Sequence, residues 1–416
     1  MLIAGQLMLP DESGDRALRL SPGWLSIDET SGRILALGPS NTCPSRTPDL
    51  GGPSSLISPG FIDTHLHLPQ FDSIGADGLE LLPWLECSIF PAEAKWVDAD
   101  YAGHMTTRIS HKLLANGTTS IAAYATVHHD ATQHAITALA AAGLTGIVGQ
   151  VLMDQHAPAE LLRPASQLLR EASQVRSHGR IRHAITPRFA ITCSDELLRG
   201  AGLLATATKA FVQTHLSETQ DECSAVRTLH NEGYVEVYRR AGLLGPRTLL
   251  GHGIWLDDAE RHIIHQSGAI IAHCPTANLF LQAGLMNLRA HERAGVRISL
   301  GSDVAGGPEI AMPRVARAMI ETAKLHRMSR NESASIPSAA HAWWQITTGN
   351  ADALGLPAGR LAISAPADLV IFNPSANSAA SAPWQTAVDP FGALLYTWDP
   401  RWITHTFAAG RIVYQS

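Results

Sequence analysis

The chain has 416 residues, of which 45% are hydrophobic and 16% charged, with a formal net charge of −6 and four lysines. This composition is typical of a folded globular protein, and the lack of a basic stripe argues against a nucleic acid polymer as partner. We therefore expect a small-molecule partner, and the length suits a barrel of about 250 residues plus a smaller unit.

The first fifteen residues, MLIAGQLMLPDESGD, do not have the pattern of a signal peptide, because they contain no basic segment and Gly5, Gln6 and Pro10 interrupt the apolar stretch. No segment reaches the roughly 18 apolar residues that a membrane span requires. The five cysteines form no CxxC pair. These features predict a cytoplasmic protein with reduced thiols and no membrane partner.

The sequence patterns at both chain ends predict short strands. WLSIDETSGRILALG (24–38) has the form of a hairpin with a turn at Gly32, and PADLVIFNPS (366–375) and ITHTFAAGRIVY (403–414) are strand-like. We predict one small β-sandwich domain built from residues 1–57 and 355–416, with two independent terminal caps as the alternative. SANSAASAPW (375–384) is predicted to be a surface loop.

The region between the ends, residues 58–354, alternates short apolar runs with amphipathic segments. Two of these segments, 101–117 and 158–179, are predicted helices, the second with Leu161, Leu162, Leu168 and Leu169 along one stripe. Eight strands, each followed by a helix, predict an α/β fold of the (β/α)8 TIM-barrel type. An open doubly wound sheet is the alternative. The runs are GFIDTHLHL, TTSIAAYATV, TGIVGQVLM, RHAITPRFAI, AFVQTHLS, TLLGHGIWL, GAIIAHCP and VRISLGSDV.

Ionisable residues gather at the predicted carboxyl ends of these strands, where barrel enzymes carry their chemistry. Any one of the 20 histidines is more often a surface or core residue, but unpaired charge buried in a barrel is costly, and a metal ion resolves that cost. Imidazole and carboxylate ligands suit zinc, with iron or manganese as alternatives. The residues are His65, His67, His215, Glu218, His252, His273 and Asp303.

This constellation resembles the amidohydrolase superfamily. Two-metal members place a carboxylated lysine at the end of strand four, whereas this chain has TPRF there. The resemblance thus implies one metal ion. Its implied ligands are His65, His67, His215 and Asp303, with His252 either a further ligand or a partner of the bound water.

A divalent ion can lower the pKa of a bound water to about 7, which provides a nucleophile at neutral pH. We expect Glu218 to act as general acid and base, although SETQDE also begins a helix that Glu218 could cap. Asp303 is expected to relay a proton to a leaving amine, and His273 to steady the tetrahedral centre.

A narrower resemblance, to the guanine deaminase family, covers nearly the whole chain. It rests on PGFIDTHLHLPQ, LLPWL, FPAE, TPRFAITCS, THLSETQDE, GHGIWL, AHCPTANLFL and GSDVAGG. It implies hydrolysis of guanine to xanthine and ammonia, a homodimer, metal ligation by His252 as well, and purine contacts from Gln70, Trp84, Leu85, Arg188 and Phe189.

These contacts suit a purine chemically. Arg188 can donate to the guanine O6, Gln70 offers both a donor and an acceptor, and the rings of Trp84 and Phe189 can hold a flat base, although both also suit an ordinary core. The remaining alternatives are a deaminase of another aminated heterocycle, such as a pterin, a triazine or cytosine, and a non-catalytic scaffold on the same barrel.

Overall fold

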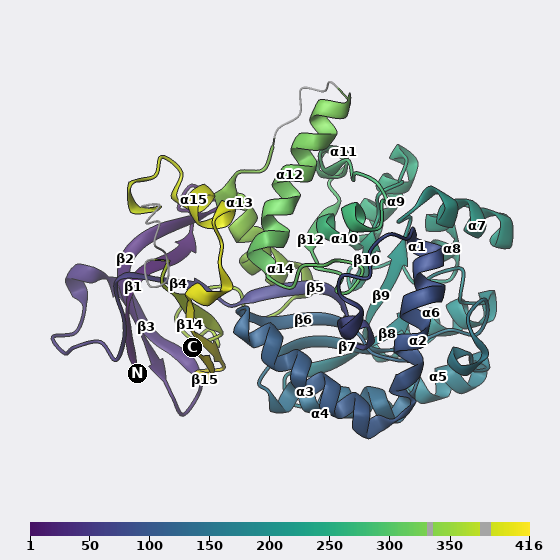
Figure 1. Cartoon of the computed structure of the whole chain (residues 1–416), viewed down its shortest axis with the longest axis horizontal. Coiled ribbons are helices and arrows are strands. Elements are labelled where there is room, and N and C mark those ends of the chain that lie inside the picture. The colour runs from purple at the N-terminus through teal and green to yellow at the C-terminus, as the bar shows by residue number, and fades with distance from the viewer. Residues whose placement is uncertain (331–335, 375–383) are drawn as a thin grey trace.

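The structure is a computed structural model that describes residues 1–330, 336–374 and 384–416. Two sheets organise it, one of eight strands and one of seven (Figure 1). β4 ends at Pro59 and the barrel strand β5 begins at Phe61, so a single residue, Gly60, joins the sheets there. No helix within the described residues is both long enough and apolar enough to cross a membrane.

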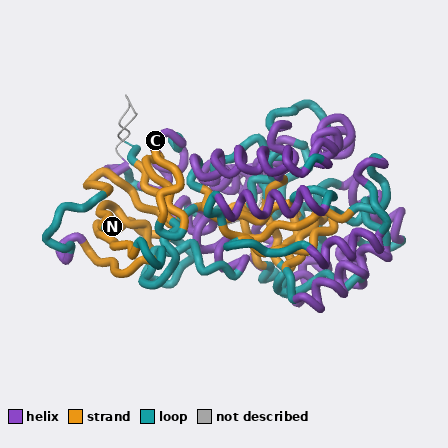
Figure 2. The backbone as a smooth tube through the Cα atoms, turned by 90° about the horizontal axis from the view of Figure 1, so that it is seen from below, coloured by secondary structure: helices purple, strands orange, loops and turns teal. Residues whose placement is uncertain are grey.

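The eight-stranded sheet is parallel and confirms the predicted barrel, with each of the eight apolar runs supplying one strand in chain order. Its interior holds a hydrophobic cluster that includes Ile62, Ala122, Ile147 and Ile270. Helices lie on either side of the strands in Figure 2, and the strands follow one another in chain order with the last, β12, in contact with the first, β5, which excludes the open-sheet alternative. The strands are β5 (Phe61–His67), β6 (Thr118–Tyr124), β7 (Thr145–Leu152), β8 (Ile181–Pro187), β9 (Phe211–Leu216), β10 (Thr248–His252), β11 (Ile270–His273) and β12 (Arg297–Leu300).

The first and last barrel strands meet at their carboxyl ends. The Asp303 amide donates to the His65 carbonyl at 2.7 Å, and the His67 amide donates to the Val304 carbonyl at 2.8 Å. Lower down, the Asn350 side chain donates to the carbonyls of Ile62 and Leu300. These bonds hold two of the sequence-predicted metal ligands, His65 and Asp303, at one point of the barrel wall.

The barrel helices follow the strands as predicted, with one correction. The expected helix over 158–179 is a short turn at Ala159–Leu161 followed by α5 (Ala165–Gln174), because Pro164 has extended backbone and starts a new helix. The helices are α1 (Leu81–Trp84), α2 (Phe90–Ala94), α3 (Ala99–Ala115), α4 (His129–Ala141), α5, α6 (Asp195–Thr208), α7 (Gln220–His230), α8 (Tyr234–Arg240), α9 (Asp258–Ser267), α10 (Pro275–Phe280), α11 (Leu288–Arg293), α12 (Met312–Arg330), α13 (Ala339–Trp344), α14 (Asn350–Leu354) and α15 (Pro390–Tyr396).

Both chain ends build the seven-stranded sheet, so the independent-cap alternative is excluded. The N-terminal strand β4 pairs with the C-terminal strand β13, and both termini lie in this part of the molecule (Figures 1 and 2). The predicted loop 375–384 falls almost entirely outside the described residues. The sheet order is β15 (Arg411–Gln415), β14 (Ile403–Ala408), β13 (Leu369–Phe372), β4 (Leu50–Pro59), β1 (Leu2–Pro10), β2 (Leu18–Asp28) and β3 (Arg33–Pro39). This arrangement supports the division into residues 1–57 with 355–416 and residues 58–354, which we keep as a proposal.

Candidate active site

The two histidines of β5 point into the mouth of the barrel. A register shift between Asp63 and Leu66 places Leu66 in the outer core while the rings of His65 and His67 lie with their centroids 5.2 Å apart. The Asp63 carboxylate accepts hydrogen bonds from the amides of His65 and Ser302. Asp63 thereby links the strand that carries both histidines to the loop that carries Asp303.

Hydrogen bonds to main-chain and amide oxygens orient the next two histidines. His215 Nδ1 lies 2.7 Å from the Arg188 carbonyl, which can only accept, so Nδ1 carries the proton and Nε2 keeps its lone pair. His252 Nδ1 lies 3.0 Å from Asn278 Oδ1 and is held in the same way. Both imidazoles therefore direct an unprotonated Nε2 toward the barrel axis, the arrangement found in metal-ligating histidines.

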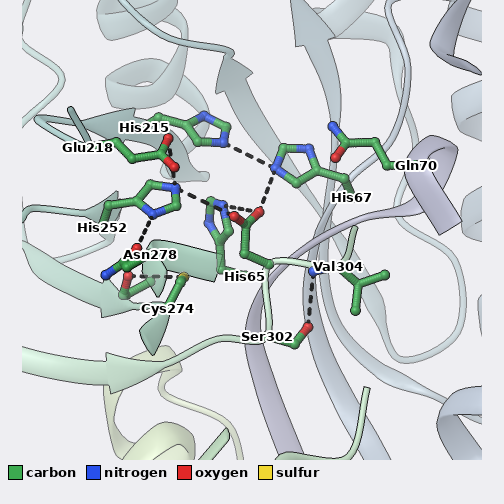
Figure 3. A network of polar contacts seen from close by, with 12 residues as sticks. His65, His67, Gln70, His215, Glu218, His252, Cys274, Asn278, Ser302 and Val304 are labelled. Carbon is green, nitrogen blue, oxygen red and sulfur yellow. Dashed lines mark hydrogen bonds and ion pairs between the residues drawn. The ribbon is translucent and has the colours of Figure 1, made fainter. Parts of the chain in front are cut away.

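Asp303 completes the cluster, whose four histidines lie close together in Figure 3. Its Oδ1 lies 3.4 Å from His65 Nε2 and 3.3 Å from His67 Nε2, and its Oδ2 lies 3.8 Å from His252 Nε2. His67 Nε2 is also 3.1 Å from His215 Nε2. The structure thus brings together all five residues that the sequence predicts as ligands.

The donor set fits a metal ion. One ligand atom from each of His65, His215, His252 and Asp303 lies within 4.8 Å of the other three, and all four residues are buried. The Nε2 atoms of His65 and His252 are buried without a hydrogen-bond partner, a costly state that a cation would relieve. Imidazole nitrogen with carboxylate oxygen is a ligand set for a catalytic transition-metal ion.

Electrostatics favours the ligating forms of these groups. Burial lowers the pKa of His67 to about 4, and burial with the neighbouring His65 lowers the pKa of His215 well below its usual value. Burial would raise the pKa of Asp303, but the adjacent side chains of His65 and His67 outweigh it and hold that pKa well below the usual range. The neutral imidazoles of His67 and His215 therefore lie near an ionised carboxylate, as metal binding requires.

Glu218 stands beside the cluster and is free for proton transfer. Its Oε2 is 3.4 Å from His252 Nε2, and its Oε1 is buried without a partner. The helix-cap alternative is excluded, since Thr219 is the N-cap residue of α7 and forms the capping box with Glu222. Burial, then the carboxylates of Asp303 and Glu222, raise the pKa of Glu218 well above its usual value, which favours holding a proton at this position.

A pocket opens onto this cluster, with an empty volume of about 370 Å³ that includes its open mouth. All five predicted purine contacts line it, together with His67, His215, Glu218, His252 and Asp303. Two lining residues, Leu81 and Leu281, were not predicted as contacts, although Leu81 is the first residue of the LLPWL motif and Leu281 is the last residue of AHCPTANLFL. The predicted contacts in the lining are Gln70, Trp84, Leu85, Arg188 and Phe189.

Two further residues differ from the sequence-based picture. Glu93, the last residue of the FPAE motif, was not predicted as a site residue, yet it lies 2.5 Å from Arg188. His273 is buried but does not line the pocket, and burial lowers its pKa to about 3. A contact of His273 with the reacting centre remains a prediction.

Known proteins share this fold and site region. Residues 56–413 match the model of the Amidohydrolase family. The guanine deaminase of Escherichia coli (strain K12) is 33% identical over 374 residues, which cover 86% of this chain and 83% of that protein. A solved structure of the E. coli guanine deaminase has a TM-score of 0.92 at 30% identity, covering 100% of this chain and 99% of that one. A guanine deaminase from C. acetobutylicum with guanine bound in the active site has a TM-score of 0.91 at 28% identity, with 99% of each chain covered.

Proposed function

The chain belongs to the amidohydrolase family, and we propose that within this family it is a guanine deaminase that hydrolyses guanine to xanthine and ammonia. The observation that carries this proposal is a single pocket in which a buried arginine and a glutamine lie beside a metal-ligand cluster. The similar guanine deaminase with guanine in its active site supports the choice of substrate.

The pocket offers the contacts that a flat, polar base requires. Trp84 and Phe189 supply aromatic surface, while Arg188 supplies donors for a carbonyl oxygen such as O6. An adenine would place an amino group opposite Arg188 and leave that buried donor unpaired, which disfavours it. We therefore propose that guanine binds with its C2 amino group toward Glu218 and Asp303.

Proton transfer by the chain's own carboxylates accounts for the reaction. We propose one zinc ion as the metal, held by His65, His67, His215 and Asp303 with His252 beside it; such an ion acidifies water and polarises a substrate atom when bound. Glu218 Oε1 takes the proton of the attacking water and passes it to a ring nitrogen. Asp303 then takes the hydroxyl proton of the tetrahedral centre and delivers it to the departing amine, so that the C2–N bond breaks, a C2 carbonyl forms and the amine leaves as ammonia.

We also propose a homodimeric assembly and a cytoplasmic location. The resemblance to guanine deaminases supports a homodimer, which sedimentation of the purified protein would test. All five cysteines are free thiols, which supports a reducing compartment such as the cytoplasm.

The test is the ultraviolet spectrum of guanine incubated with purified, metal-loaded protein, with ammonia measured in parallel. We expect conversion of the guanine spectrum into that of xanthine with one ammonia per base. Pterin, triazine and cytosine substrates belong in the same panel. Turnover of one of these with no reaction of guanine would refute the proposal.

A further inference from the structure

We propose that Glu93 is a positioning residue that sets the hydrogen-bonding polarity of the pocket, so that the site accepts a carbonyl beside a ring N–H rather than an amino group beside a bare ring nitrogen. This inference rests on the proposed function and concerns how the same pocket selects its substrate. Glu93 lies outside the pocket lining, so it acts through the two residues it contacts.

One carboxylate oxygen of Glu93 contacts both of the polar residues predicted to bind the purine, Arg188 and Gln70. Oε1 lies 2.5 Å from Arg188 Nη1 and accepts from Gln70 Nε2 at 3.0 Å. Arg188, Glu93 and Gln70 are each at least 97% buried, so water does not screen these bonds. Arg188 and Gln70 line the pocket, and Figure 3 shows Gln70 beside the metal-ligand candidate His67.

The FPAE motif builds the support for Arg188. Phe90 and Glu93 are three residues apart in α2 and therefore share one helix face. The guanidinium of Arg188 lies over the Phe90 ring at 5.6 Å while Glu93 binds its edge. Ring and carboxylate together hold the arginine side chain in one place.

The contact with Glu93 fixes which end of the Gln70 side-chain amide faces the ligand. A free glutamine can present either its carbonyl or its amino end to a ligand. An ionised carboxylate can only accept, so Gln70 must turn Nε2 toward Glu93, which leaves Oε1 as the acceptor on the other side. The pocket therefore presents a donor from Arg188 and an acceptor from Gln70.

This polarity matches one kind of heterocycle edge. Guanine carries the acceptor O6 next to the donor N1–H, whereas a 6-amino purine carries a donor next to an acceptor. Glu93 also balances the charge of Arg188, so the pair does not favour an anionic ligand over a neutral one. The selected class is a neutral cyclic lactam with an adjacent amino group.

Glu93→Gln tests the proposal because it keeps the volume but removes the charge that fixes both neighbours. Guanine and 2,6-diaminopurine carry the same 2-amino group and differ at C6, so they probe polarity directly. We expect kcat/KM for guanine to fall by about 10- to 100-fold, mainly through KM. We also expect preference for guanine over 2,6-diaminopurine, measured as turnover or as inhibition constants, to fall by at least about tenfold.

Glu86→Gln is the matched control, because Glu86 lies in the same segment between β5 and α3 but is exposed. It should leave activity and preference unchanged. Metal content should be the same in E93Q as in wild type, whereas the melting temperature should fall because Arg188 stays buried without its charged partner. If E93Q folds poorly, E93D is the second variant. It keeps the negative charge beside Arg188 and should therefore bind guanine more tightly than E93Q does.

An unchanged guanine preference in E93Q, or an equal loss for both purines, would refute the role of Glu93 while leaving guanine deamination intact. Wild-type protein without guanine turnover would instead refute the proposed function, and with it this inference. The two failures are therefore distinguishable in one set of assays.

Discussion

Replacing Gly251 by alanine should weaken metal binding, because the added methyl group would displace the ring of His65. A Cβ at residue 251 would lie 2.6 Å from His65 Cε1 and 3.1 Å from its Nδ1. Carbon atoms in contact rest about 3.5 to 4.0 Å apart, so the ring must move by about 1 Å. The backbone cannot easily retreat, because Gly251 is paired with His215 on one side and Ala272 on the other.

A displacement of about 1 Å is several times the ~0.2 Å tolerance of metal–ligand distances. We therefore expect metal affinity to fall by about 10- to 100-fold or more, with a loss of stability of about 1 to 3 kcal/mol from overpacking. Zinc titration against a chromophoric chelator measures the affinity, and thermal unfolding measures the stability. Gly245→Ala is the control, since a Cβ there meets nothing within 4 Å. Wild-type metal affinity in the Gly251→Ala protein would show that His65 is not a ligand.

Three other changes probe the proposed chemistry. Glu218→Gln should lower kcat for guanine by about 10²- to 10⁴-fold while metal content stays constant, and a loss below tenfold would contradict proton transfer by this residue. Arg188→Ala should abolish most guanine turnover. It should also lower the unfolding free energy by about 3 to 5 kcal/mol, because Glu93 would be buried without its partner. Unchanged turnover would show that the role of Arg188 is structural only. Removal of metal by a chelator should stop deamination and lower the melting temperature. Zinc added at 100 times its Kd should restore about 2.7 kcal/mol of unfolding free energy. Activity that survives complete removal of metal would exclude the metal mechanism.

Much of the barrel could be predicted because its strands are buried on both faces and are therefore continuous apolar runs. The prediction of one helix over 158–179 was wrong. The stripe of leucines continues across Pro164, but the helix does not, because α5 begins only after this residue. Periodicity records which residues are buried, and Leu161 is indeed buried on the short turn before α5. It does not record where a backbone amide is missing.

Glu93 illustrates the limit for the site. The FPAE motif was noticed, but the partner of its carboxylate, Arg188, is 95 residues away and directly follows the strand β8. Local spacing carries no information about such a pair. By contrast, His65, His215 and Asp303 could be predicted to meet, because each follows or ends a barrel strand and all such ends lie at one rim.

His252 and His273 show why position at a strand end is not sufficient. On β10, Leu249 lies in the barrel interior and Leu250 in the outer core, so strict alternation would place His252 outside. His252 nevertheless lines the pocket, because its backbone is left-handed, with φ at 69°, and turns the ring back toward the axis.

His273 has the same parity on β11, where Ala272 is interior, but its backbone is not left-handed and its side chain stays out of the pocket. Ser217 and Asp303 share the left-handed conformation, with φ at 47° and 51°. Such residues cost about 1 to 3 kcal/mol each and persist where the surrounding structure holds them. The strained turns after the strands, more than the strands themselves, therefore determine which of the predicted residues reach the metal-ligand cluster.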